Sequence, residues 1–252
     1  ILSGLVGSEM CIRDSFYSVV ATDTALALEK YLSLKGATVV DVGGGPGFFS
    51  REFIERGANC LLVEPMAEPL HVERTQFRDA HDRHDYLTLP GRLMKGSTLA
   101  GDGMALGLRS DVADLTFSSN VLEHIPRPAD MLAEMWRVTK PGGILYMSYT
   151  LWWSPWGGHE TSPWHFLGGH YAARRFEKKH GRRPSNYYGE SLFTHRVGPV
   201  LKIARSLPHS EIDIFPRYYP RWTKWIVSVP FLRELLAWNV VVVLRKAHEV
   251  TP

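Results

Sequence analysis

The stretch that decides the fold reads TVVDVGGGPG and occupies residues 38–47. Its first half is a β-branched run typical of a buried strand, and its second half supplies four glycines that permit a tight turn. A strand that turns through glycines into a helix is a common place for an α/β protein to bind a nucleotide-type ligand. The sequence therefore predicts a parallel sheet with a ligand site directly after this strand.

Outward from these glycines, short apolar runs alternate with amphipathic stretches, as in a parallel sheet connected by helices. Pro46 is expected to open the first helix, and Gly57 to end it. The KPGG turn at 140–143 is expected to lead into the fifth strand. Further strands are predicted at 59–63, 97–100, 113–118, 144–149, 211–215 and 239–244, and further helices at 128–138 and 191–206.

The length of 252 residues and the lack of an internal repeat predict a single domain over residues 16–249. Within it, residues 150–190 interrupt the alternation and are expected to be an insertion on the substrate side. Residues 1–15, ILSGLVGSEMCIRDS, resemble a peptide that appears when adapter-derived reads are translated. We expect them to be non-native or disordered, so that the true amino terminus would be missing.

Charge and cysteine content restrict the partners and the compartment. Twenty-nine basic and 26 acidic residues leave a formal charge of +3, too small to indicate a dedicated nucleic-acid binder. The two cysteines build no disulfide framework, which predicts a cytoplasmic protein. The apolar run at 240–244 is far shorter than the roughly 20 residues of a membrane-spanning helix, so no transmembrane anchor is expected. The sequence assigns no oligomeric state.

The spacing of the glycines disfavours two common nucleotide sites. A dinucleotide fingerprint would place its third glycine at position 48, where the chain has Phe48, and Gly47 comes one residue early. No lysine followed by serine or threonine completes a P-loop. Two carboxylates follow later strands: Glu64 could accept hydrogen bonds from ribose hydroxyls, and Asp102 could accept one from the adenine amine.

The ordered motifs DVGGGPG, LLVEP, GDGM, SSNVLEHIPRP and KPGG, within residues 38–149, together resemble the class I S-adenosylmethionine-dependent methyltransferases of type 11. The resemblance implies a Rossmann-like doubly wound sheet of about seven strands, mostly parallel with an antiparallel edge. It also implies S-adenosyl-L-methionine as cofactor, with S-adenosyl-L-homocysteine as product. Asp41 and the glycines would then line the methionine portion, and Asp102 with Met104 the adenine. The residues expected to bind the cofactor are Asp41, Gly43, Gly44, Gly45, Gly47, Glu64, Pro65, Asp102, Gly103, Met104, Ser119, Asn120 and Val121.

The acceptor is less specified than the cofactor. The segments GGHE at 157–160, HFLGGHYAARR and NYYGESLF resemble an actinobacterial group of uncharacterised methyltransferases, and that likeness assigns no substrate. We expect methyl transfer to O, N or C of a small-molecule or lipid-like acceptor. Two alternatives stay open: an NAD(P)-dependent oxidoreductase on a related fold, and a cofactor-binding module without turnover.

Candidate catalytic residues lie among the tryptophans that follow the fifth strand. A general base near the sulfonium is needed where the acceptor must lose a proton. His159, Glu160 and His165 are the candidates, His159 being favoured, and a hydrogen-bonding or surface role is the alternative for each. His124 is interpreted as a structural residue at a helix start. No metal is expected, because the histidines are irregularly spaced without cysteine and the HDRHD run at 81–85 indicates a solvated loop.

A peripheral membrane contact is a further alternative for residues 218–246, which are rich in Trp, Arg and apolar side chains. The interpretation we favour for this stretch is burial as the last helix and strand.

Overall fold

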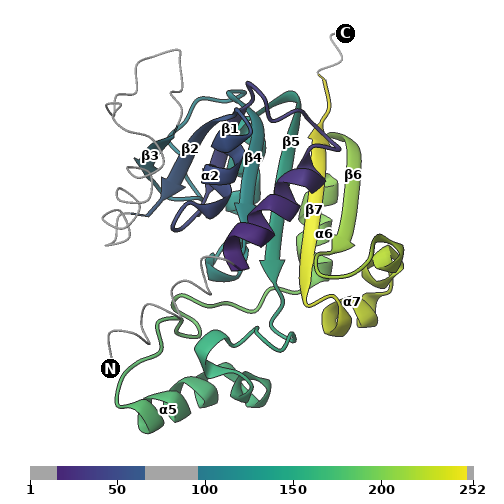
Figure 1. Ribbon diagram of the computed structural model, residues 1–252. Helices are drawn as coiled ribbons and strands as arrows, with labels where there is room; N and C mark the ends of the chain where they lie inside the picture. Colours follow the sequence, from purple (N-terminus) through teal and green to yellow (C-terminus); the bar gives the residue numbers. More distant parts are fainter. Residues whose placement is uncertain (1–15, 66–95, 249–252) are drawn as a thin grey trace.

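The computed structural model describes residues 16–65 and 96–248. Seven strands form one sheet in the order β3-β2-β1-β4-β5-β7-β6 (Figure 1), which confirms the predicted Rossmann-like doubly wound sheet. The strands are β1 (Thr38–Val42), β2 (Asn59–Glu64), β3 (Ser97–Ala100), β4 (Ala113–Ser119), β5 (Thr139–Thr150), β6 (His209–Pro216) and β7 (Asn239–Lys246). Residues 1–15, the HDRHD run and residue 249 lie outside the described residues, so the predictions for them stay predictions.

The pairing of the strands places the ligand site. Strands β3, β2, β1, β4 and β5 are parallel, and antiparallel pairing is confined to the other edge, where β7 lies between β5 and β6. The mostly parallel sheet with an antiparallel edge is therefore confirmed. The strand order reverses between β1 and β4, and in doubly wound sheets ligands bind beyond the carboxyl ends of the strands at this switch point.

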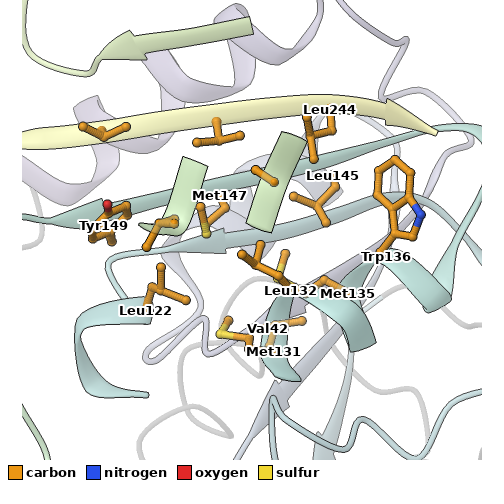
Figure 2. Packing of buried hydrophobic residues seen from close by; sticks show 14 of the residues in the cluster. Val42, Leu122, Met131, Leu132, Met135, Trp136, Leu145, Met147, Tyr149 and Leu244 are labelled. Carbon is orange, nitrogen blue, oxygen red and sulfur yellow. The ribbon is translucent and has the colours of Figure 1, made fainter. Parts of the chain in front are cut away.

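Helices cover both faces of the sheet (Figure 1). On one face, the helix at residues 16–28 and α2 (Phe48–Glu55) share an apolar cluster in which Phe53 packs edge-on to Phe117 of β4. On the other face, α4 (Pro128–Val138) and α6 (Val197–Ser206) bury their apolar sides. Figure 2 shows Met131, Leu132 and Met135 of α4 directed at the sheet. The two clusters pack β1 and β4 from both faces of the sheet.

Three element boundaries differ from the prediction. Helix α2 begins at Phe48 and not at Pro46, because Gly47 takes a left-handed φ of 81° and its carbonyl accepts the first helical bond from Arg51. The predicted helix at 191–206 begins at Val197. The KPGG turn lies inside the long strand β5, where Gly142 has a φ of 77°.

The segment at 150–190 follows β5 and lies beyond the carboxyl ends of the parallel strands (Figure 1). It contains η2 (His159–Thr161), η3 (Trp164–Leu167) and α5 (Gly169–His180). Three further short helices are η1 (Leu122–His124), η4 (Arg221–Ser228) and α7 (Pro230–Leu236). Within residues 16–65 and 96–248, no helix has both the length and the apolar character needed to cross a membrane.

Candidate active site

The glycine loop lies at the carboxyl end of β1, where doubly wound sheets bind ligands in a crevice. Gly43, Gly45 and Gly47 all have positive φ, a region that side chains with a Cβ rarely adopt. A Cβ on Gly43 would lie 2.5 Å from a methyl of Val121, and one on Gly44 would collide with Leu62 and Asp41. A Cβ on Gly45 would meet nothing within 4 Å. The loop is therefore packed from below at two glycines and open above the third.

Two carboxylates hold this loop in place. Asp41 is fully buried and accepts a 2.6 Å hydrogen bond from the Ser50 hydroxyl of α2. Glu64, at the end of β2, accepts a hydrogen bond from the Gly45 amide through Oε1. Burial raises the pKa of Glu64, and the hydrogen bond from Gly45 offsets part of that rise. One oxygen of Glu64 therefore supports the loop, a role that sequence reasoning did not foresee, and Pro65 follows it as an exposed residue.

The GDGM turn follows β3 next to the glycine loop. The amide of Gly101 donates to the carbonyl of Glu64, so this turn is tied to the end of β2. Asp102 is exposed and accepts a 2.8 Å hydrogen bond from the Met104 amide. Gly103 approaches Val42 closely enough that a Cβ would lie 3.1 Å from its methyl group. The structure thus brings Asp102, Gly103 and Met104 to the same sheet edge as the glycines.

The turn after β4 lies on the other side of the switch point from β1. Asn120 has a left-handed φ of 58°, and its side-chain oxygen accepts a 2.7 Å hydrogen bond from the buried Asn239 of β7. The Ser119 hydroxyl accepts a 2.8 Å hydrogen bond from Arg217, which also donates to Ser148 and Thr24. Arg217 and Asn239 are distant in sequence from this turn, so no sequence signal indicated them.

Three polar side chains meet where η1 approaches η2. Glu123 is 2% exposed; its Oε1 accepts from the Thr150 amide at 3.1 Å. The ring centroids of His124 and His159 are 5.0 Å apart. Burial, with the neighbouring His124 as a smaller cause, lowers the pKa of His159 to about 4. His159 is thus uncharged at neutral pH, and its φ of 48° is one of few positive values outside glycine.

The other two candidate catalytic residues have different partners. The Glu160 carboxylate accepts hydrogen bonds from the amides of Ser185 and Asn186, and these bonds lower its pKa against the opposing effect of burial. His165 is fully buried, and its Nε2 lies 3.1 Å from the Ser154 carbonyl oxygen. Both contacts stabilise the segment at 150–190, so we place the proposed chemistry at His159.

A doubly wound sheet with a glycine loop at its switch point, and carboxylates at the ends of the next two strands, is the arrangement of Rossmann-like proteins, a class in which nucleotide-type ligands bind at this point. Comparison with known proteins then specifies the family. Residues 40–147 match the family model described as a methyltransferase domain. An uncharacterized methyltransferase of Mycobacterium bovis is 42% identical over 235 residues, covering 91% of this chain and 87% of that protein.

Two solved structures share the fold. One is an S-adenosylmethionine-dependent methyltransferase from Mesorhizobium loti, with a TM-score of 0.54, 20% identity and coverage of 88% of this chain and 96% of that one. The other is an N-methyltransferase from Haemonchus contortus in complex with phosphomonomethylethanolamine and S-adenosylhomocysteine, with a TM-score of 0.58, 15% identity and coverage of 90% and 53%. The chain belongs to the family of methyltransferases that includes the Mycobacterium bovis protein. The family decides against the nicotinamide-dependent oxidoreductase.

Proposed function

We propose that this methyltransferase binds S-adenosyl-L-methionine in the crevice formed after β1 to β4 and methylates a lipid-like acceptor at a membrane surface. The observation that carries the acceptor class is a set of large apolar side chains left exposed in η4 and α7. Trp222 is 74% exposed and Phe231 is 72% exposed. Isolated apolar residues on a surface need no explanation, but a contiguous set favours an interaction site.

The residues around the crevice fit the cofactor. The backbone at Gly45 is open, which allows close approach of a ligand, while the packing below Gly43 and Gly44 keeps the loop from collapsing. In the proposed complex, Glu64 faces the ribose with the oxygen that does not hold the loop, and Asp102 with Met104 holds the adenine. Asp41 supports the loop from beneath. When bound, the cofactor supplies an electrophilic methyl group on a sulfonium.

The acceptor is proposed to lie beside Glu123, His124 and His159, on the side of the crevice covered by the segment at 150–190. Val121 packs against Gly43 and directly precedes η1, so this polar cluster follows the turn that borders the proposed methionine end of the crevice. Among the three residues predicted to be catalytic, His159 is our candidate for contact with the acceptor. Its Nε2 is buried and has no hydrogen-bond partner among the described residues.

Trp238 lies in the chain between α7 and β7. The next residue, Asn239, donates a hydrogen bond to the Asn120 side chain. The centroid of a Trp238 ring lies 5.4 Å from that of Trp156 and 5.7 Å from that of Tyr219. The stretch 217–236 carries four basic residues and one acidic residue, but Arg221 and Lys224 pair with Asp213, so the proposal rests on the exposed apolar side chains. β7 is buried as the sequence predicted, but helix α7 buries none of its residues. Membrane contact therefore becomes our proposal for η4 and α7.

The first experiment measures flotation of the protein with vesicles that contain anionic lipid, for the wild type and for the double variant Trp222→Ala/Phe231→Ala. Each lost side chain is expected to weaken binding about tenfold or more, because burial of such a side chain contributes about 1.5–3 kcal/mol. Leu26→Ala is the matched control, since Leu26 is 51% exposed on the helix at 16–28. Equal flotation of all three proteins would remove the proposed docking surface.

The second experiment tests the acceptor itself. Wild-type protein and labelled S-adenosyl-L-methionine are incubated with a membrane lipid extract and, separately, with a water-soluble metabolite extract. Label in the lipid fraction supports the proposal, and label in the soluble fraction alone contradicts the lipid-like acceptor. Binding of S-adenosyl-L-homocysteine, measured by calorimetry, checks the cofactor crevice independently. Tight binding without a labelled product in either extract would favour the alternative of a binding module without turnover.

A further inference from the structure

We infer that Glu123, His124 and His159 form a binding site for a first-row divalent transition-metal ion beside the crevice. The three residues come from two segments, η1 after β4 and η2 after β5, which the sequence separates by more than thirty positions. Each offers one ligand atom, and these atoms all lie within 4.8 Å of one another. The spacing argument against a metal considered the histidines of the 150–190 segment and did not foresee this combination.

Two of the three donors are buried and lack a partner. Glu123 Oε2 and His159 Nε2 are both inaccessible to solvent, and neither has a hydrogen-bond partner among the described residues. The Glu123 side chain as a whole is 2% exposed. Buried polar atoms in folded proteins are nearly always hydrogen-bonded, and a bound ion is one of the accepted reasons for an exception. A cation between the two atoms would satisfy both.

Hydrogen bonds to the non-ligating atoms of these side chains orient the ligating atoms, as such bonds do in known metal sites. His124 Nδ1 lies 2.6 Å from the carbonyl oxygen of Ser191. A carbonyl only accepts, so Nδ1 carries the hydrogen and the lone pair is on Nε2. Glu123 Oε1 accepts from the Thr150 amide, which leaves Oε2 for the ion. The peptide carbonyl of Glu123 accepts from Phe193, so the segment that orients His124 also fixes the backbone of Glu123.

The donor set determines the class of metal. Two imidazoles and one carboxylate suit zinc, cobalt or ferrous iron, whereas magnesium and calcium prefer oxygen donors. In a tetrahedral site with bonds of about 2.0–2.1 Å, ligand atoms are about 3.4 Å apart, so no pair of the three donors, which lie within 4.8 Å of one another, has to close by more than about 1.4 Å. Three protein donors leave at least one coordination position open. The open position is where an oxygen or nitrogen of the acceptor would bind, so that His159 would act on the acceptor through the ion and not by direct contact; this last step rests on the proposed function.

The test uses the full chain, freed of metal with a chelator and then titrated with Co²⁺, whose visible absorption reports its ligands. The wild type is expected to bind one equivalent that Zn²⁺ displaces. Glu123→Gln and His159→Ala are expected to weaken binding by about 100-fold or more. The control is His170→Ala, because His170 is exposed in the same segment. Glu123→Gln keeps the shape of the side chain, which guards against a variant that fails to fold.

Stoichiometric Co²⁺ binding that is lost in both site variants and kept in the control supports the site. No stoichiometric binding by the wild type, or equal binding by all four proteins, overturns it and leaves a water-mediated polar cluster or scattered surface histidines as the explanation. S-adenosyl-L-homocysteine affinity is measured on the same preparations. Retained cofactor binding without Co²⁺ binding refutes the metal site alone, whereas lost cofactor binding by the wild type refutes the proposed function.

Discussion

The close contact between Gly43 and Val121 gives the sharpest prediction. Gly43→Ala must place its Cβ 2.5 and 2.6 Å from the two Val121 methyls while the backbone keeps a φ of +73°. The left-handed conformation costs an alanine about 1–2 kcal/mol. Overpacking adds about 1–3 kcal/mol. Gly36→Ala is the matched control, because Gly36 has a φ of +79° with nothing within 4 Å of its Cβ position.

The two variants separate strain from the clash. In both variants the strained backbone lowers the free energy of unfolding, which is measured by urea denaturation. The clash with Val121 is expected to lower it by about 1–3 kcal/mol more in Gly43→Ala. Adding Val121→Ala should return most of this difference, and the single Val121→Ala variant completes the double-mutant cycle. Calorimetry should show S-adenosyl-L-homocysteine affinity unchanged in Gly36→Ala and lowered about 10- to 100-fold in Gly43→Ala, because the loop is displaced.

Equal destabilisation by the two alanines, with equal cofactor affinity, would refute this reasoning. It would mean that Val121 moves aside without cost and that the floor of the crevice is not set by this contact. If Val121→Ala does not restore the stability that Gly43→Ala loses, the clash lies with another residue.

Three further predictions concern other supports of the site and the sheet. Glu64→Ala removes the acceptor of the Gly45 amide and should weaken S-adenosyl-L-homocysteine binding about tenfold or more in calorimetry. The affinity of Glu64→Gln should lie between those of Glu64→Ala and the wild type, because an amide oxygen still accepts a hydrogen bond. Equal affinities of the three proteins would contradict the role of this bond. Ser50→Ala leaves a buried carboxylate without its hydroxyl donor and should lower the free energy of unfolding by about 1–3 kcal/mol in urea, and a loss under 0.5 kcal/mol would speak against it. Burial and the hydrogen bond to Asp213 raise the pKa of Tyr31 to about 12, above the unfolded value of about 10, so its stabilisation is complete below pH 10 and is lost as the pH rises through 12. The stability advantage of the wild type over Tyr31→Phe in urea should therefore shrink between pH 10 and 12, and a constant difference would show that this pKa is not raised.

The sequence predicted the sheet well because each parallel strand carries its own local signal. Even the weak strand at 97–100 is observed as β3 with the predicted bounds. Helix starts were less predictable: Pro46 is a good opening residue, but the left-handed Gly47 determines where α2 begins. At the start of α6, the amides of Val197 and Gly198 donate to the carboxylate of Glu234 in α7, and such a long-range contact has no periodic signature.

The site was predictable where its residues follow strands, and only there. The glycines, Glu64 and the GDGM turn come together because parallel strands end at one edge of the sheet. The cluster of Glu123, His124 and His159 depends on how the segment after β5 folds back, which no spacing encodes. In the same way, Glu160 and His165 could not be separated from His159 by residue type, because their different hydrogen-bond partners appear only in the structure.

The position of β7 also constrains the order in which the sheet is completed. This strand is the last in the chain, yet it lies between β5 and β6, and its apolar residues from Val240 to Leu244 are almost fully buried. During synthesis, β6 therefore emerges with no neighbour to pair with and must wait until residue 246 is made. Until then both β5 and β6 present open hydrogen-bonding edges, so a nascent chain stalled after residue 216 would be prone to edge-to-edge association.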